Sequence, residues 1–238
     1  METSEPSSPK TTKEFARNLF CELHQAILQH EAGALSGNVE SVHDMRVGIR
    51  RLRVAMNNFA VCLGKKERRH WRKRLENLAN ALGTVRDLDV ITEALKRQAI
   101  TQTESDRRAI LSFVFLSIRR GRAMSKPLKV KAISKDDPIQ TTAVKILRTR
   151  LKEFYSHWND PQRIPSAPEL HNLRISGKRL RYSAEQLREL FPDRLSLLID
   201  LLKRSQDLLG EIQDCVTQRA LFAAEKTRLE KRSSSKDE

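Results

Sequence analysis

The sequence is poor in the residues that typify sheet proteins and disulfide frameworks. Its 238 residues include 8 glycines, 8 prolines and 5% aromatic residues, while Leu, Ala, Glu, Lys and Arg are abundant, a composition typical of helices rather than of sheets. The three cysteines, Cys21, Cys62 and Cys215, are isolated and lack CxxC spacing, which argues against a disulfide framework and a zinc site. We therefore expect an all-α protein from a reducing compartment.

Long hydrophobic runs are also missing. No stretch of about eighteen consecutive apolar residues occurs. The N-terminal segment METSEPSSPKTTK lacks the apolar core of a signal peptide. We therefore expect no membrane span and a cytoplasmic location.

Sequence signatures of catalysis are equally scarce. The chain holds no Gly-rich phosphate loop, GxSxG elbow or Cys/His nucleophile pair. Two short ExxH spacings, Glu40 with His43 and Glu67 with His70, resemble part of a di-iron carboxylate site in a helical bundle, but the surrounding arginines would repel a metal cation. We expect binding without turnover and no catalytic residue, metal or cofactor, with a metal-dependent phosphohydrolase as an alternative.

Positive charge is what the sequence has in excess. Lys and Arg number 45 against 30 Asp and Glu, which gives a formal net charge of +15 and a pI near 10.1. A charge of this size indicates a polyanionic partner. DNA, RNA, an anionic membrane surface and inorganic polyphosphate all fit, so charge alone does not choose among them.

One basic segment occurs twice. HDMRVGIRRLR at 43–53 matches HNLRISGKRLR at 171–181 at an offset of 128 residues, and LGTVRD at 82–87 matches LGEIQD at 209–214 at an offset of 127. The order of the blocks indicates a duplicated unit of about four helices, and hence two pseudo-symmetric antiparallel helical bundles. Only residues 215–230 follow the last block before a polar tail. The second copy is therefore expected to be shortened, and the sequence leaves open whether a partner chain completes it.

Apolar residues recur at three- and four-residue spacing along most of the chain. This spacing predicts helices over residues 13–32, 39–62, 66–97, 104–125, 138–157, 167–190 and 194–230. The first bundle is expected to span 13–126 and the second 138–230, with a linker at 127–137 and disordered tails at 1–12 and 231–238.

Each repeated segment places cations on one face of a helix, because residues at three- and four-residue spacing share a sector of roughly 80°. The first basic face consists of His43, Arg46, Arg50 and Arg53. The second basic face consists of His171, Arg174, Lys178 and Arg181. Met45, Ile49 and Leu52 lie on a neighbouring sector of the first helix and are predicted to be buried.

Neither basic face contains an acidic residue. Like charges three and four residues apart destabilise an isolated helix by about a few tenths of a kcal/mol per pair, so a cost present in both copies indicates a compensating role. Guanidinium groups form planar bidentate hydrogen bonds with phosphate oxygens. The two faces are therefore predicted to bind a phosphate-rich anion, and to line one basic cleft if the duplicated helices face each other.

Further residues are predicted to support these faces. Asp87 and Asp214 close the repeated LGxxxD blocks and are expected to pair with arginines of the basic faces and orient them. Arg72 and Arg86 lie fourteen residues apart on one long helix and are expected to extend the binding surface. Close packing is expected at two helical glycines of the same blocks, Gly83 and Gly210.

The duplicated HxxRVxxRRLR and HxxRIxxKRLR segments, each followed by an LGxxxD block, resemble the CHAD family, the conserved histidine α-helical domains. The resemblance covers about residues 13–218 and implies two four-helix bundles with a basic central groove, so that 13–230 would form one CHAD domain. It also implies non-catalytic binding of inorganic polyphosphate and association with polyphosphate granules and their proteins. By position, the basic motif of the family falls on the two basic faces.

A nucleic-acid-binding helical protein is the other main alternative. Proteins that bind single strands add aromatic side chains on which bases stack, and both basic faces contain only cations and a histidine. This favours polyphosphate modestly, and the preference for it comes mainly from the family resemblance. The sequence leaves open whether the protein forms an oligomer.

Overall fold

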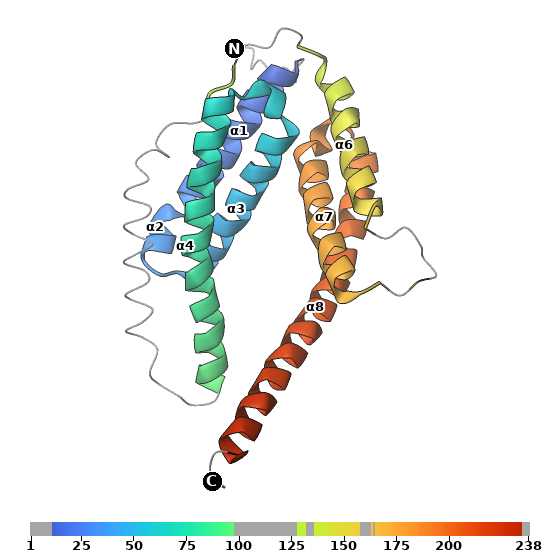
Figure 1. Ribbon diagram of the computed structural model, residues 1–238. Coiled ribbons are helices and arrows are strands. Elements are labelled where there is room, and N and C mark those ends of the chain that lie inside the picture. Colours follow the sequence, from blue (N-terminus) through green and yellow to red (C-terminus); the bar gives the residue numbers. More distant parts are fainter. Residues whose placement is uncertain (1–10, 98–127, 132–135, 158–162, 164, 235–238) are drawn as a thin grey trace. The chain divides into compact units, whose positions relative to one another are not determined.

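The computed structural model describes residues 11–97, 128–131, 136–157, 163 and 165–234, without the side chains of 84–97, 217–218 and 220–234. Every regular element within these ranges is a helix (Figure 1), which confirms the all-α prediction. The chain divides into two compact units between Thr142 and Ala143. The predicted helix at 104–125 and the side chains of Arg86 and Asp87 lie outside the described residues.

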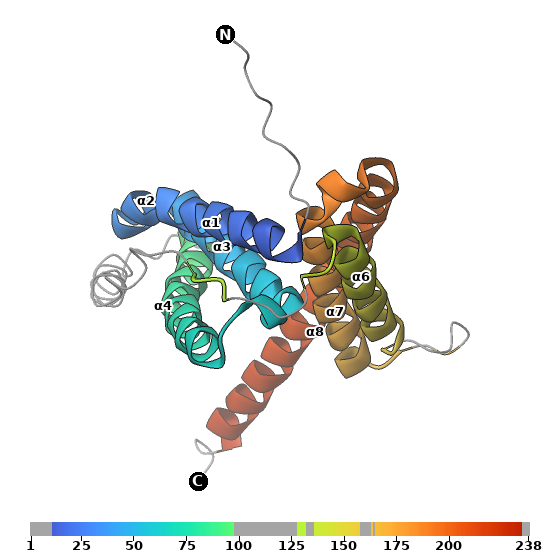
Figure 2. The same cartoon turned by 90° about the horizontal axis from the view of Figure 1, so that it is seen from above.

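The described part of the first unit is built around helix α3. Its elements are α1 (Thr12–Gln29), α2 (Glu31–Leu35), α3 (Val39–Asn58), the 3-10 turn η1 (Ala60–Cys62) and α4 (Lys65–Arg97). Helix α3 packs against both α1 and α4 (Figure 2). Phe20, Ile49 and Trp71, one from each of these helices, are at most 2% exposed. The apolar side of α3 is thus enclosed, and its polar side remains at the surface.

A turn fixes where α3 begins. Gly37 has a φ of 83°, a left-handed conformation that glycine adopts without a steric penalty. The side-chain oxygen of Asn38 then accepts a hydrogen bond of 2.8 Å from the backbone N–H of Ser41, the usual role of an N-cap residue. The helix predicted over 13–32 ends at Gln29 instead, and the short α2 lies between it and this turn.

The described residues of the predicted linker pack on the first unit. Leu128 is 4% exposed, and the backbone N–H of Lys131 donates to the carbonyl of Cys62 at 2.9 Å. The hydroxyl of Thr12 donates to the carbonyl of Asp137 at 2.7 Å. These bonds tie both described ends of the linker to the first unit, so the boundary between the units falls inside the next helix.

The second unit contains three long helices in its described part. Helix α6 (Ile139–Tyr155) enters it from the first unit, and α7 (Ala167–Gln186), the 3-10 turn η3 (Arg188–Leu190) and α8 (Pro192–Ser234) follow. Helices α7 and α8 run antiparallel (Figure 1). Their core includes Leu180, Leu187, Ile199 and Leu202. Helix α8 continues into the segment that was predicted to be a disordered tail.

A capping arrangement starts α7. The carboxylate of Glu169 accepts hydrogen bonds from the backbone N–H of Ser166 at 2.8 Å and from its hydroxyl at 2.7 Å, and it also accepts one from Arg163. The bond from Arg163, followed by those from Ser166, lowers the pKa of Glu169 to about 2. This carboxylate therefore stays charged at the N-terminus of α7, where the helix dipole favours a negative charge.

Candidate anion-binding surfaces

Helix α3 presents the first basic face beside its buried side. Met45, Ile49 and Leu52 are at most 1% exposed, as their spacing predicted. The side chains of Arg50 and Arg53 are exposed. Neither arginine forms a hydrogen bond or ion pair with any residue that the structure describes. Both guanidinium groups are thus open to an external anion.

Arg46 is held in place by helix α4. Its Nη1 atom donates a hydrogen bond of 2.8 Å to the carbonyl oxygen of Leu82. A Cβ atom on the next residue, Gly83, would lie 3.4 Å from the same nitrogen, at the lower limit of ordinary van der Waals contact. The close neighbour of this glycine within the described residues is therefore an arginine side chain.

The residues predicted to extend the first basic face lie on α4. The side chain of Arg72 is exposed and, like Arg50, forms no hydrogen bond or ion pair within the described residues. His43 is likewise exposed, at the start of the face. The side chains of Arg86 and Asp87 lie outside the described residues, so their predicted roles stay predictions.

The second basic face repeats the contact between arginine and glycine. The Nη2 atom of Arg174 on α7 lies 3.8 Å from the position of a Cβ atom on Gly210 of α8. The Nε atom of Arg174 is buried and has no hydrogen-bond partner among the residues that the structure describes. An arginine with an unsatisfied buried nitrogen carries a desolvation cost. An anion bound to this guanidinium would reduce that cost by balancing its charge.

Arg181 at the end of the second basic face is occupied by neighbours. Its Nε atom donates to the Gln206 side chain at 2.9 Å and its Nη1 atom to Glu185 at 2.8 Å. Its guanidinium carbon also lies 4.7 Å from the centre of the Tyr182 ring. The side chain is 18% exposed. Arg181, predicted from its spacing to contact phosphate, is therefore bound within the protein.

Sequence reasoning missed the two residues that bind Arg181. Glu185 could have been found, because it lies four residues after Arg181, the spacing of helical ion pairs. Gln206 comes from α8, and no local pattern links it to Arg181. Only the packing of α7 on α8 brings the two side chains together.

Asp214 does not form the ion pair that was predicted for it. Its side chain is exposed, and within the described residues it pairs with no arginine of the second basic face. Its neighbour Gln213 instead approaches α7, with its side-chain oxygen 3.0 Å from Nδ1 of His171. The reason is the phase of α8, since one residue along a helix turns the side-chain direction by about 100°.

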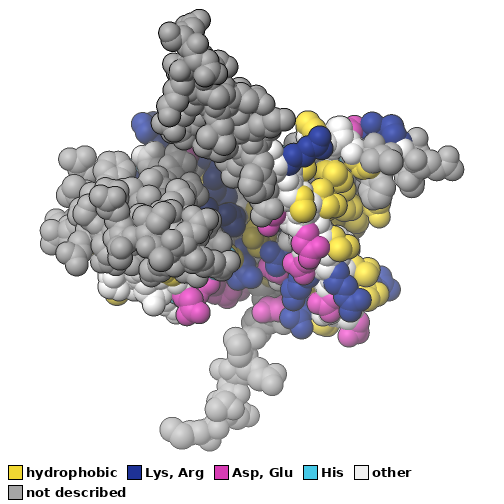
Figure 3. Space-filling model, turned by 90° about the horizontal axis from the view of Figure 1, so that it is seen from below, with side chains coloured by type: hydrophobic (Ala, Val, Ile, Leu, Met, Phe, Trp, Pro, Cys, Tyr) yellow, Lys and Arg dark blue, Asp and Glu magenta, His cyan; other side chains and the backbone are white. Residues whose placement is uncertain are grey.

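A second unpredicted carboxylate, Glu153 on α6, also binds arginines. It accepts hydrogen bonds from Arg150 and from Arg179 of α7. Burial raises the pKa of Glu153, but these hydrogen bonds outweigh burial and hold the pKa below its usual range. Figure 3 shows the result on the second unit, at the right, where Lys and Arg side chains are interspersed with Asp and Glu.

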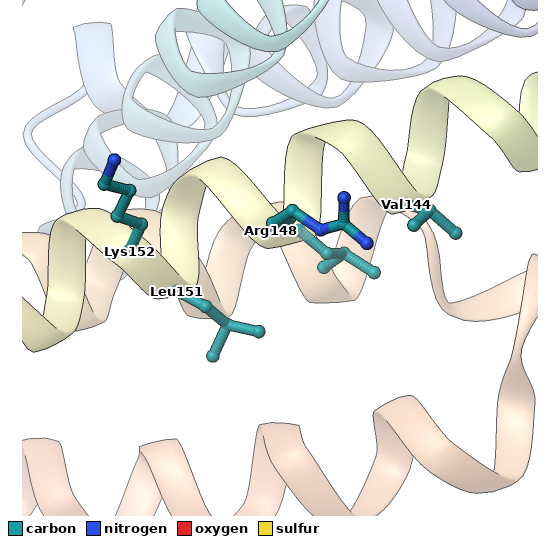
Figure 4. A pocket seen from close by; sticks show the side chains of 5 residues that line it. Val144, Arg148, Leu151 and Lys152 are labelled. Atoms are coloured by element: carbon teal, nitrogen blue, oxygen red, sulfur yellow. The ribbon is translucent and has the colours of Figure 1, made fainter.

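An apolar groove on α6 is lined by none of the residues of the basic faces. It is lined by Val144, Leu147, Arg148, Leu151 and Lys152 (Figure 4). In the close-up, Val144 and Leu151 point to the same side of the helix. Because one helix supplies the whole lining, the groove is an open surface without a converging set of polar groups.

Helix α8 of the same unit also has exposed apolar side chains. Leu197 is 66% exposed, Leu201 53% and Leu208 62%. Figure 3 shows hydrophobic side chains gathered on the second unit beside its charged ones. The second unit thus combines an apolar surface with a surface of mixed charge.

The residues that would serve metal binding or thiol chemistry have other surroundings. Within the described residues, no group of three or more His, Cys, Asp and Glu side chains could hold a metal ion. Glu67, from one ExxH spacing, accepts hydrogen bonds from the Trp71 indole at 3.1 Å and the Lys129 backbone at 3.3 Å.

Burial, followed by the charge of Asp136, raises the pKa of the Cys62 thiol to about 11, so this thiol stays protonated. No helix in the described ranges is long and apolar enough to cross a membrane.

The chain resembles a known family in sequence and a solved structure in fold. The sequence matches the family model described as CHAD domain over residues 18–223. The fold is similar to the crystal structure of the CHAD domain from the plant Ricinus communis, with a TM-score of 0.69 and 21% sequence identity over 95% of this chain and 83% of that chain. No curated protein matches the sequence.

Proposed function

Because the chain belongs to the CHAD domain family, we propose that it binds inorganic polyphosphate without turning it over and associates with polyphosphate granules. The contacts are the first basic face with Arg72, and His171, Arg174 and Lys178 of the second basic face. Arg181 is left out because Glu185 and Gln206 bind it. The bound polyanion supplies negative charge to Arg50, Arg53 and Arg72, which have no acidic partner within the described residues.

One observation carries this proposal. Arg50, Arg53 and Arg72 are exposed without an acidic partner in the described part of the chain. A solvated face of an ordinary helix pairs such cations with acids three or four residues away. Unpaired guanidinium groups suit a chain of phosphates, because each group can form two charge-assisted hydrogen bonds.

Two features support the proposed preference for a flexible phosphate chain over nucleic acid. Both basic faces lack aromatic side chains, on which unstacked bases would rest. Arg46 and Arg174 have their guanidinium groups against glycines of the neighbouring helix, so they are pre-positioned for phosphate oxygens. Pre-positioned charge favours a ligand that consists of little besides phosphate.

A calorimetric titration with long-chain polyphosphate, repeated with single-stranded and duplex nucleic acid as competitors at equal phosphate concentration, tests the proposal. We expect polyphosphate to bind and the nucleic acids not to displace it. Displacement at equal phosphate would instead identify a nucleic-acid-binding protein. Release of orthophosphate in the presence of magnesium or manganese would indicate a phosphohydrolase.

A pair of double variants locates the binding surface. We expect Arg50→Ala with Arg53→Ala to weaken polyphosphate binding by about a hundredfold or more, because each of the two lost charge-assisted contacts contributes about 1.5–3 kcal/mol. Lys65→Ala with Lys66→Ala removes the same charge from exposed positions at the start of α4 and should cost much less. Equal losses in the two variants would mean that only the overall charge of the chain matters.

A further inference from the structure

The two basic faces differ most at their last position. Arg53 and Arg181 occupy the same place in the repeated segment. Arg53 is exposed and has no partner in the described part of the chain. Arg181 is 18% exposed and donates to both Glu185 and Gln206. Equivalent arginines are therefore open in one copy and occupied in the other.

The sequence explains why this difference arises. At the 128-residue offset of the basic segments, Glu185 corresponds to Asn57, which has no negative charge. At the 127-residue offset of the LGxxxD blocks, Gln206 corresponds to Ala79, which has no side-chain acceptor. The first copy thus lacks both groups that bind Arg181 in the second copy.

Binding a phosphate has a different cost at the two arginines. An anion at Arg181 must replace a 2.8 Å ion pair with Glu185 and compete with the negative charge that stays beside it. An anion at Arg53 has only to order an exposed side chain. Glu153 adds to the difference in binding cost, because its carboxylate pairs with Arg150 and Arg179 on the second unit.

We propose that the two basic faces are unequal polyphosphate sites: the first basic face supplies the stronger contacts, and Glu185 weakens the second by acting as an internal counter-ion to Arg181. This inference rests on the proposed function and concerns how affinity is divided within it. Glu185 is accordingly an affinity-setting residue that touches no ligand. Arg181 serves to join α7 to α8 through Gln206.

The decisive variants change one charge without removing a large side chain. Glu185→Gln keeps the size of the side chain and removes the counter-ion, so we expect polyphosphate to bind about three- to tenfold more tightly. Adding Arg181→Ala to Glu185→Gln should abolish that gain. Asn57→Glu places a carboxylate four residues after Arg53, as Glu185 lies after Arg181, and should weaken binding by about threefold to tenfold.

A matched control separates this local effect from overall charge. Gln25→Glu also adds one negative charge to an exposed position of the first unit, but no cation lies three or four residues from it on α1. It should change binding by less than about twofold. Each variant is titrated as the full chain by calorimetry, and thermal unfolding by circular dichroism identifies variants that no longer fold.

The outcomes distinguish this inference from the proposed function. Tighter binding by Glu185→Gln together with weaker binding by Asn57→Glu supports unequal faces. If the parent protein binds polyphosphate but neither variant differs from the Gln25→Glu control, the inequality is overturned and the proposed function stands. If the parent protein does not bind polyphosphate, both are overturned.

Discussion

Two helical glycines lie beside arginines of a neighbouring helix. A Cβ atom on Gly83 would lie 3.4 Å from Arg46, and one on Gly210 would lie 3.8 Å from Arg174. The contact recurs in both copies of the repeated segments. A helical glycine is usually costly by about 1 kcal/mol relative to alanine, and here the cost accompanies a defined side-chain position.

The glycine positions differ in how they would tolerate alanine. A Cβ atom on Gly210 would lie 3.8 Å from Arg174, an ordinary contact. We therefore expect Gly210→Ala to raise the free energy of unfolding by about 0.5–1 kcal/mol, through helix propensity. Urea unfolding followed by circular dichroism measures the change.

Gly33 provides the comparison for that prediction. A Cβ atom there would lie 2.7 Å from Cβ of Ser41, so Gly33→Ala should destabilise the protein despite the same gain in propensity. A stabilising Gly33→Ala or a destabilising Gly210→Ala would contradict this reading of the two contacts.

For single residues, the sequence predicted which side chains are buried better than it predicted which residues they contact. The three- and four-residue spacing identified Met45, Ile49 and Leu52 as buried, and the structure agrees. It could not show that Gln213 rather than Asp214 approaches His171. That choice depends on the rotation of one long helix against another, which composition and spacing do not determine.

Among the helices, α7 has the most clearly defined start. Glu169 accepts hydrogen bonds from Arg163 and from Ser166, and these lower its pKa to about 2 from the ordinary 4.5. A carboxyl group whose pKa is lower in the folded state stabilises the fold above its unfolded pKa. The contribution is lost as the pH falls through the folded pKa.

A pH series with Glu169→Gln tests this helix start. The variant should melt at a lower temperature than the parent protein at pH 7, because it cannot carry the charge. The difference should be complete above about pH 4.5 and shrink as the pH falls toward 2. Melting temperatures from circular dichroism give the comparison. A difference that is constant from pH 7 to pH 2 would exclude a role for the charge.

At the scale of helices, the pattern of apolar residues located most elements but not their exact ends. The helix predicted over 39–62 ends at Asn58, and a 3-10 turn follows. The one predicted over 167–190 ends at Gln186 in the same way. In both cases the apolar spacing continues through the turn, because a 3-10 turn buries side chains at nearly the same interval.

For the whole molecule, charge and fold carry different information. The fold is similar to a plant CHAD domain at only 21% identity, so a likeness in fold accompanies a largely different sequence. The net charge of +15 indicated a polyanion but no particular one. The basic faces were visible in the sequence because they are repeated, whereas their inequality depends on contacts between helices.

The excess charge predicts a steep dependence of binding on salt. Each phosphate contact releases counter-ions, so the logarithm of the affinity should fall linearly with the logarithm of salt concentration, by about 0.7 per contact for a single-stranded polyanion. Fluorescence anisotropy with labelled polyphosphate, measured over a salt series, gives the slope for the full chain. Replacing both Arg50 and Arg53 by alanine should reduce it by about 1.4. An unchanged slope would place these arginines outside the contact.

The internal pair of Arg181 and Glu185 also has a genetic consequence. Codons for glutamate differ by one base from codons for glutamine and for lysine. A single nucleotide change at position 185 can therefore neutralise or reverse the charge beside Arg181 while the hairpin of α7 and α8 keeps its apolar core. If the chain binds polyphosphate as proposed, its affinity is open to adjustment by point mutation, without rebuilding the basic surface.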